Sequence, residues 1–197
     1  MDNYTRYAPP EDYYSKTKNR KPSAYLNQAV GLIHKTKKNA LDFGCGAGSD
    51  SRFLVNSGFN VIAVDGNPQS LEYIEKLPHQ DKITFICSPF EKFSFDQYDL
   101  VSSFRALSFI HKDIFNDVMN ALLGSLNTDG IFVGEFYGVK DEWNKPHETM
   151  TFLDKEQIYS IFKNMSLIAV HEEEKDDHTA NGKPKHWHRF YVIAQNL

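Results

Sequence analysis

Short apolar runs alternate along the chain with longer stretches in which apolar residues recur every three or four positions. Runs of about four to eight apolar residues are typical of buried strands, and the longer period is typical of helices with one buried face. Their alternation predicts a parallel sheet with helices on both faces. The predicted strands are residues 40–43, 60–64, 83–87, 98–104 and 131–136, followed by two longer extended runs at 167–173 and 186–195.

Helix starts are marked by residues that favour caps. Asp154, with Gln157 three positions later, has the pattern of a capping box. A polar segment, 176–184, joins the last two extended runs and predicts an antiparallel hairpin. We therefore predict an α/β fold with a doubly wound, mostly parallel, seven-stranded Rossmann-like sheet and a C-terminal antiparallel hairpin. The predicted helices span Pro22 to Ile33, Phe53 to Gly58, Asn67 to Leu77, Ile114 to Leu126 and Asp154 to Phe162.

Size and charge narrow the possible classes of protein. A chain of 197 residues with 41% hydrophobic content suits one core, so we expect a lid or tail at 1–21 and a single domain at 22–197. The formal net charge of −4 gives no basic surface for nucleic acid or membrane. No transmembrane segment or signal peptide is predicted. The two cysteines, Cys45 and Cys87, predict reduced thiols in a cytoplasmic protein and no metal centre. We also expect a monomer or homodimer.

A glycine-rich turn follows the first predicted strand. Gly44, Gly46 and Gly48 allow a tight strand-to-helix turn and a close approach of the backbone to a ligand. Ser49 stands where the dinucleotide fingerprint requires its last glycine, which disfavours a nicotinamide enzyme. Asp65 ends the second strand, where a carboxylate can accept hydrogen bonds from both ribose hydroxyls. A turn with a purely structural role is the alternative interpretation.

With these motifs, residues 22–136 resemble the class I methyltransferases that use S-adenosylmethionine. The segment 41–48, Leu-Asp-Phe-Gly-Cys-Gly-Ala-Gly, matches the family's loop around the methionine and ribose parts of the cofactor, and Asp65 matches its ribose-binding acid. A carboxylate near the loop suits a sulfonium cation, which has no pyrophosphate. The resemblance implies that S-adenosylmethionine contacts Asp42, Gly44, Cys45, Gly46, Gly48, Asp65, Gly66 and Asn67.

The next two strand ends supply further candidate cofactor contacts. Ser88 stands where the family usually carries an acid for the adenine amino group, and Pro89 and Phe90 follow it. Phe90 is interpreted either as a stacking partner of adenine or as a core residue. Ser103 and Arg105 follow the fourth strand and should face the cofactor or the acceptor, because ligands of parallel sheets bind at the carboxyl ends of the strands. Arg105 pairs either with an acidic substrate or with a carboxylate of the fold.

Three residues are candidate catalytic bases. His111 precedes the long helix, where a helix-start or surface role is the alternative, and Tyr137 opens a segment, 137–151, that we expect to be an active-site loop. His178 lies in the hairpin turn, in a pattern that resembles the tellurite-resistance methyltransferases, whose basic hairpin residues reach toward the acceptor. That group has an arginine after the histidine, where this chain has Thr179, so the group's activity need not follow.

The expected reaction is an in-line methyl transfer from S-adenosylmethionine to a small-molecule acceptor, such as a thiol, selenium or tellurium compound. Positioning supplies most of the catalysis, because the sulfonium already activates the methyl group. A nucleic-acid methyltransferase is disfavoured by the negative charge and by 103–106, which lack the usual motif. A non-catalytic, regulatory protein that binds S-adenosylmethionine remains the alternative.

Two segments outside these motifs invite a functional interpretation. Tyr7, Tyr13 and Tyr14 lie in an N-terminal segment that we interpret as either a lid against the sulfonium or a disordered tail. His186 and His188 share one face of a predicted strand, but no third metal ligand is evident. We therefore expect an edge-facing polar strand there.

Overall fold

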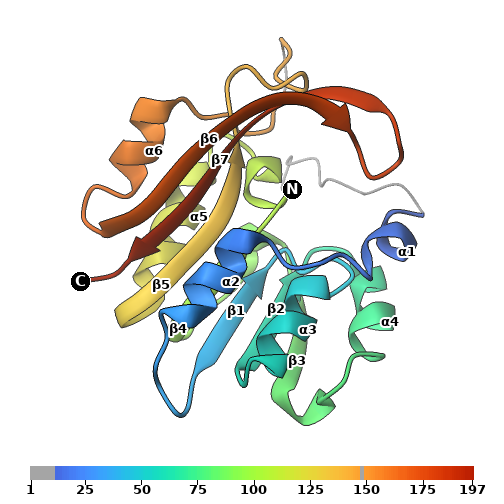
Figure 1. Ribbon diagram of the computed structural model, residues 1–197, viewed down its shortest axis with the longest axis vertical. Coiled ribbons are helices and arrows are strands. Elements are labelled where there is room, and N and C mark those ends of the chain that lie inside the picture. Colours follow the sequence, from blue (N-terminus) through green and yellow to red (C-terminus); the bar gives the residue numbers. More distant parts are fainter. Residues whose placement is uncertain (1–11, 147–148) are drawn as a thin grey trace.

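The computed structural model describes residues 12–146 and 149–197, and these form one seven-stranded sheet in the order β3-β2-β1-β4-β5-β7-β6 (Figure 1). Strands β1 to β5 are parallel to one another, whereas β7 pairs antiparallel with both β5 and β6. The predicted α/β fold with its C-terminal hairpin is therefore confirmed. The strands are β1 Asn39–Phe43, β2 Asn60–Asp65, β3 Ile83–Cys87, β4 Tyr98–Ser103, β5 Leu126–Tyr137, β6 Ser166–His178 and β7 Pro184–Gln195.

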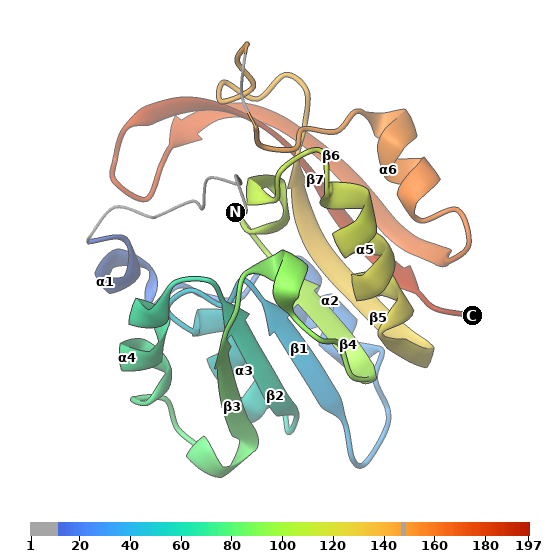
Figure 2. The same cartoon turned by 180° about the vertical axis from the view of Figure 1, so that it is seen from behind.

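Helices cover both faces of the sheet. In the two opposite views, α2 and α3 lie over one face, and α5 and α6 lie over the other (Figures 1 and 2). The chain reaches these positions because each connection between parallel strands crosses over the sheet. Within the described residues, no helix combines the length and apolarity needed to span a membrane. The helices are α1 Tyr13–Thr17, α2 Ala24–Gly31, α3 Ser49–Asn56, α4 Leu71–Ile74, α5 Phe115–Gly124 and α6 Lys155–Ile161.

Two hydrophobic clusters, one on each face, hold the helices to the sheet. The clearest helical stripe of the sequence packs α5 on β5, with Met119 and Leu122 buried in the same cluster as Phe132. On the other face, Leu26 of α2 and Leu54 of α3 are completely buried. The alternation of apolar positions thus predicts the faces correctly, because each stripe is wide enough to cover the sheet.

The structure corrects the predicted boundary between the long helix and the fifth strand. The helix stripe was predicted to continue to Leu126, but α5 ends at Gly124 and Leu126 begins β5, where it pairs with Tyr98. The Asp129–Gly130 pair, a sequence typical of turns, is a local irregularity inside β5, with a left-handed φ of 63° at Asp129. Leu126 is buried in either arrangement, so its apolar character alone does not separate a helix end from a strand start.

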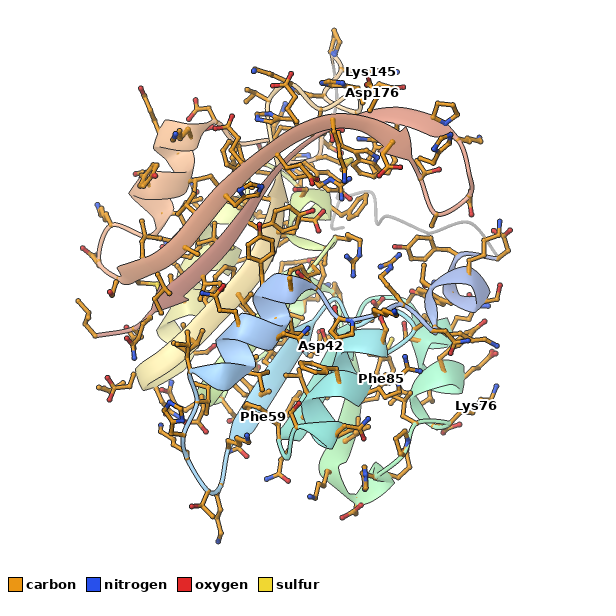
Figure 3. The ribbon with its side chains drawn as sticks, in the orientation of Figure 1. Asp42, Phe59, Lys76, Phe85, Lys145 and Asp176 are labelled. Carbon is orange, nitrogen blue, oxygen red and sulfur yellow. The ribbon has the colours of Figure 1, made fainter. Side chains whose placement is uncertain are left out.

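The β6–β7 hairpin curves as an arch beyond the parallel strands (Figure 1). A buried ion pair, Lys185 with Asp141, joins β7 to the segment that follows β5. The Lys185 ammonium also lies 3.7 Å from the ring centre of Trp187 and 4.4 Å from that of Trp143. Segment 138–146 is therefore fastened to the arch. In the view of Figure 3, Lys145 of this segment and Asp176 of β6 both lie at the arch, away from Asp42 on β1.

Candidate functional site

A cavity opens at the carboxyl ends of β1, β2 and β4, and we call it the carboxyl-edge cavity. Helix α1 and residues 104–114 complete its wall. A parallel sheet places its ligand sites at this edge, so the location agrees with the sequence prediction. Its lining consists of Tyr13, Tyr14, Thr17, Arg20, Gly44, Cys45, Gly46, Ala47, Ser49, Asp50, Asp65, Gly66, Asn67, Pro89, Phe90, Glu91, Phe104, Arg105, Ala106, Phe109, Ile110, His111 and Ile114.

The glycine loop after β1 adopts a conformation that other residues rarely reach. Gly44, Gly46 and Gly48 have φ angles of 86°, 51° and 73°. The loop is fixed to β2, since the backbone N–H groups of Gly44 and Cys45 donate to the Val64 carbonyl at 2.8 and 2.9 Å. A Cβ on Gly44 would lie 2.2 Å from Cβ of Ala106. Glycine is therefore required here for both backbone conformation and space.

Asp65 holds the loop from the end of β2. Its Oδ2 accepts a 2.8 Å hydrogen bond from the Gly46 backbone N–H, and its Oδ1 accepts one of 2.9 Å from Asn67. Burial raises the pKa of Asp65, and these two hydrogen bonds partly oppose the shift. The carboxylate also lines the cavity, where its remaining lone pairs can accept hydrogen bonds from a ligand's hydroxyl groups.

Helix α1 packs over the glycine loop beside α4 (Figure 1). Tyr14 is 3% exposed, and its hydroxyl lies 3.4 Å from Oδ1 of Asp65. Its ring makes an edge contact with Tyr73, at 5.7 Å between ring centres. Residues 13–17 are thus a packed helix, and Tyr13 and Tyr14 both line the cavity. Tyr7 lies outside the described residues, and the role of the segment as a lid stays a prediction.

The end of β3 contributes two of its three predicted residues to the cavity. Pro89 and Phe90 line it, and Phe90 also packs on Phe43 with ring centres 4.3 Å apart. Phe90 therefore belongs to both the cavity wall and the core, and its stacking on adenine stays a prediction. Ser88 is not part of the lining, and its hydroxyl donates to the Pro89 carbonyl at 2.9 Å.

The residues after β4 divide in the same way. Ser103 is buried outside the lining, and its hydroxyl donates to the Phe43 carbonyl at 2.6 Å, which ties β4 to β1. Arg105 lines the cavity, with guanidinium nitrogens 3.7 Å from Asp50 Oδ2 and 3.8 Å from Glu135 Oε2. Arg105 was predicted to pair with either an acidic substrate or a carboxylate of the fold, and in the structure its neighbours are carboxylates of the fold.

Comparison with known proteins agrees with this geometry. Residues 40–130 match the family described as a methyltransferase domain. TehB from Haemophilus influenzae superposes with a TM-score of 0.78 at 18% identity, over 95% of this chain and 67% of that chain. The fold is that of a class I S-adenosylmethionine-dependent methyltransferase. The N-methyltransferase NodS from Bradyrhizobium japonicum, determined with S-adenosylhomocysteine, also superposes, with a TM-score of 0.66 at 13% identity over 87% of this chain and 85% of that chain.

Two sequence relatives carry the same type of activity in their names. The cypemycin N-terminal methyltransferase of a Streptomyces species is 31% identical over 99 residues, which are 46% of this chain and 40% of that protein. The probable S-adenosylmethionine-dependent methyltransferase CRG1 of Saccharomyces cerevisiae is 27% identical over 130 residues, 64% of this chain and 44% of that protein. The chain therefore spans less than half the length of these two curated relatives.

Within this methyltransferase fold, the three predicted catalytic residues lie in three different environments. His111 lines the cavity. Tyr137 does not: it is 3% exposed among Phe109, Trp143 and Trp187, and burial raises its pKa well above the usual range. His178 is exposed in the hairpin, also outside the lining. The structure thus brings only His111 of the three to the cavity.

The segment 137–151 was expected to be an active-site loop, and its described residues do not line the cavity. Residues 138–146 pack against the arch instead, through the interior pair of Asp141 and Lys185, and Thr151 hydrogen-bonds to the carbonyls of Ser108 and Ile110. The expectation of an edge-facing strand for His186 and His188 is also wrong. Strand β7 lies between β5 and β6, and His188 is buried with its Nε2 3.0 Å from Glu172.

Sequence reasoning missed three charged residues of this region. Arg20 and Asp50 line the cavity, and Glu135 is the 2% exposed partner of Arg105. Two of them leave a signal in the sequence: Asp50 closely follows the glycine loop, and Glu135 is an isolated acid in an apolar strand. Arg20 stands in a basic, polar segment where nothing distinguishes it.

Asp42 lies on β1, one residue before the strand ends, and is absent from the cavity lining. Figure 3 shows it in the interior of the fold on β1. Its Oδ2 accepts a 2.5 Å hydrogen bond from the Ser51 hydroxyl at the start of α3. Burial, and then the charge of Asp50, raise the pKa of Asp42, while Ser51 lowers it. Among the described residues, Asp42 thus contacts α3 and lies outside the cavity lining, and its contact with the cofactor stays a prediction.

Replacing Asp42 by asparagine should therefore stabilise the protein near neutral pH. The raised pKa means that folded Asp42 keeps a proton that the unfolded chain releases, so the parent loses stability as pH rises above about 4. Asparagine has no such proton and still accepts from Ser51. Urea unfolding across pH should show the variant's advantage growing as pH rises from 4 to 7. A constant or shrinking difference contradicts this, and exposed Asp81→Asn is the control.

Proposed function

We propose that this chain binds S-adenosylmethionine in the carboxyl-edge cavity and transfers the methyl group to a small-molecule acceptor by in-line displacement. The observation that carries the proposal is the Asp65 carboxylate. It is held by the Gly46 and Asn67 backbone N–H groups beside a cradle that no residue larger than glycine can line at position 44. This arrangement suits a ribose lying across the loop.

The residues of the cavity fit the parts of the cofactor. Asp65 is suited to accept from the ribose hydroxyls, and Pro89 and Phe90 offer an apolar wall for adenine. Asp50 is buried, and its Oδ1 has no hydrogen-bond partner, so it is suited to accept from the ammonium of the amino-acid end. When bound, S-adenosylmethionine supplies an electrophilic methyl group on its sulfonium.

This chain's contribution is to exclude water and to align the acceptor. Tyr13 and Phe109 are part of the cavity wall. A wall of this kind holds the nucleophilic atom of the acceptor in line with the methyl–sulfur bond. As the acceptor atom bonds to the methyl carbon, the electron pair of the broken carbon–sulfur bond remains on sulfur. His111 is the one cavity-lining residue of the three predicted bases, and it is placed to take a proton where the acceptor carries one. Thiolate, selenium and tellurium acceptors need no such base.

Incubation with methyl-labelled S-adenosylmethionine and a panel of thiol, selenite, tellurite, phenol and amine acceptors tests this function. The expected results are micromolar or tighter binding of S-adenosylhomocysteine by calorimetry and label transfer to at least one acceptor. Binding without transfer to any acceptor favours the regulatory alternative. A chain that binds a nicotinamide dinucleotide but not S-adenosylhomocysteine refutes the proposal.

His111→Ala should slow transfer to phenols and amines more than transfer to thiols.

A further inference from the structure

The backbone of Arg105 is unusual for its residue type. Arg105 follows β4 with a φ of 57°, and only His79 and Asp129 share a positive φ among the described non-glycine residues. The left-handed region disfavours side chains with a Cβ, and glycine, asparagine and aspartate occupy it more readily than arginine. Strained positions of this kind concentrate at functional sites. Local backbone preference therefore does not explain an arginine here.

The Arg105 guanidinium is held in place but retains hydrogen-bonding capacity. Its nearest carboxylate oxygens, on Asp50 and Glu135, lie 3.7 and 3.8 Å away, beyond hydrogen-bond distance. Burial lowers the pKa of Arg105, but the surrounding groups, Glu135 and Asp50 foremost, together raise it by more, so the guanidinium stays charged. Its side chain is 25% exposed and lines the cavity. A charged donor in this state is suited to an anion.

Glu135 fixes the direction of this guanidinium. It lies on β5, is 2% exposed, and neither of its carboxylate oxygens has a hydrogen-bond partner in the described residues. Besides Arg105, its near cation is Arg189, at 3.9 Å. A buried carboxylate persists only with compensating charge, so Glu135 and the two arginines constrain one another. Arg105 is consequently drawn toward β5.

Sheet order separates this position from the ribose end of the cavity. Asp65 ends β2, and the order β2-β1-β4-β5 puts β1 between it and the strand that precedes Arg105. Three of the apolar residues that line the cavity, Phe109, Ile110 and Ile114, follow Arg105 within nine positions of the chain. A small ligand with an apolar body and one anionic group matches these walls.

We propose that Arg105 determines acceptor specificity by binding a carboxylate of the methyl acceptor, and that Glu135 is the positioning residue that orients it. The inference rests on the proposed function, because it assigns the other ligand of the same cavity. The amino-acid end of the cofactor also carries a carboxylate, so the test must distinguish the two sources. A planar guanidinium fork recognises either one in the same way.

Calorimetry with benzoate and benzamide tests the acceptor side, using protein saturated with S-adenosylhomocysteine and protein without it. The parent should bind benzoate about ten- to a hundredfold more tightly than benzamide. Arg105→Asn, which tolerates the left-handed backbone, should abolish this preference, and Arg105→Lys should retain part of it. The matched control is His79→Asn, at an exposed left-handed position outside the cavity. A parent without preference for benzoate, or an Arg105→Asn variant that keeps it, overturns the inference.

Two cofactor analogues separate the sources of the carboxylate. S-adenosylhomocysteine carries the amino-acid end, and 5′-methylthioadenosine lacks it. Arg105→Asn should change the affinity for both by less than about threefold. A tenfold or larger loss confined to S-adenosylhomocysteine assigns Arg105 to the cofactor and overturns the acceptor assignment. If the parent fails to bind S-adenosylhomocysteine, the proposed function fails. The benzoate preference measured on protein without S-adenosylhomocysteine still decides whether Arg105 binds a carboxylate.

The positioning role of Glu135 has its own readout. Glu135→Gln should lower the benzoate preference about tenfold in the parent and have no further effect in the Arg105→Asn background. A residue with a purely structural role would lower the melting temperature without this dependence on Arg105. Equal effects of Glu135→Gln on the benzoate preference in both backgrounds therefore overturn the positioning role. If Arg105→Asn does not fold, Arg105→Lys, which should retain only part of the benzoate preference, takes its place in these tests.

Discussion

Asp65→Ala should weaken the binding of S-adenosylhomocysteine by at least about a hundredfold. The substitution removes the acceptor of the Gly46 and Asn67 backbone N–H groups and the acceptor available to ribose. Hydrogen bonds to a charged group contribute about 1.5–3 kcal/mol each, so losing two to a ligand corresponds to a hundredfold or more. Titration calorimetry measures the change directly.

Two further variants make the Asp65 result specific. Asp65→Asn keeps the size of the side chain but loses its charge, and it should fall between the parent and alanine. Asp81→Ala removes an exposed acid from another turn and should leave the affinity unchanged. Parental affinity in Asp65→Ala would place the cofactor elsewhere and remove the basis of the proposed function.

Gly44→Ala should both destabilise the protein and abolish cofactor binding. The new Cβ would lie 2.2 Å from Cβ of Ala106 and 3.3 Å from the Phe90 ring, at a φ of 86°. Either the glycine loop or residues 104–106 must move, and both line the cavity. Overpacking of this kind, together with the left-handed backbone, should cost about 2–4 kcal/mol of unfolding free energy.

Urea unfolding of matched variants separates the causes of this loss. Gly31 lies in α2 with no atom within 4 Å of an added Cβ, so Gly31→Ala should be neutral or stabilising by up to about 1 kcal/mol. In Gly44→Ala/Ala106→Gly the clash is removed while the backbone strain remains, so stability should recover in part. Gly44→Ala with parental stability and affinity would show that the loop is more adaptable than its contacts indicate.

The sequence predicts the sheet well because both signals it uses are local. Strand-length apolar runs and helical stripes specify which faces are buried. The positions of the glycine loop after β1 and of Asp65 at the end of β2 follow from parallel topology. This pattern does not predict which side chains at that edge line the cavity and which are buried beneath it. Asp42 and Ser103 lie at the predicted edge of the sheet, but neither lines the cavity. Each side chain instead forms a hydrogen bond with another part of the fold.

Long-range contacts account for the remaining errors. Tyr137 and the segment after it were assigned to the cavity, but the pairing of Asp141 with Lys185 draws them toward the arch. Those two residues are far apart in the chain, and no periodicity relates them. The partnership of Arg105 with Glu135 is hidden for the same reason, since β4 and β5 become neighbours only in the folded sheet.

The position of β7 bears on how the protein is made. Strand β7 follows β6 in the chain but lies between β5 and β6 in the sheet. On the ribosome, β6 therefore emerges before the strand that links it to β5, and it waits as an unpaired segment while the first five strands can already assemble. A nascent chain stopped before β7 would expose the β5 edge and an entirely unpaired β6, and such strands invite aggregation. Translation through β7 is thus the step that commits the chain to its complete sheet.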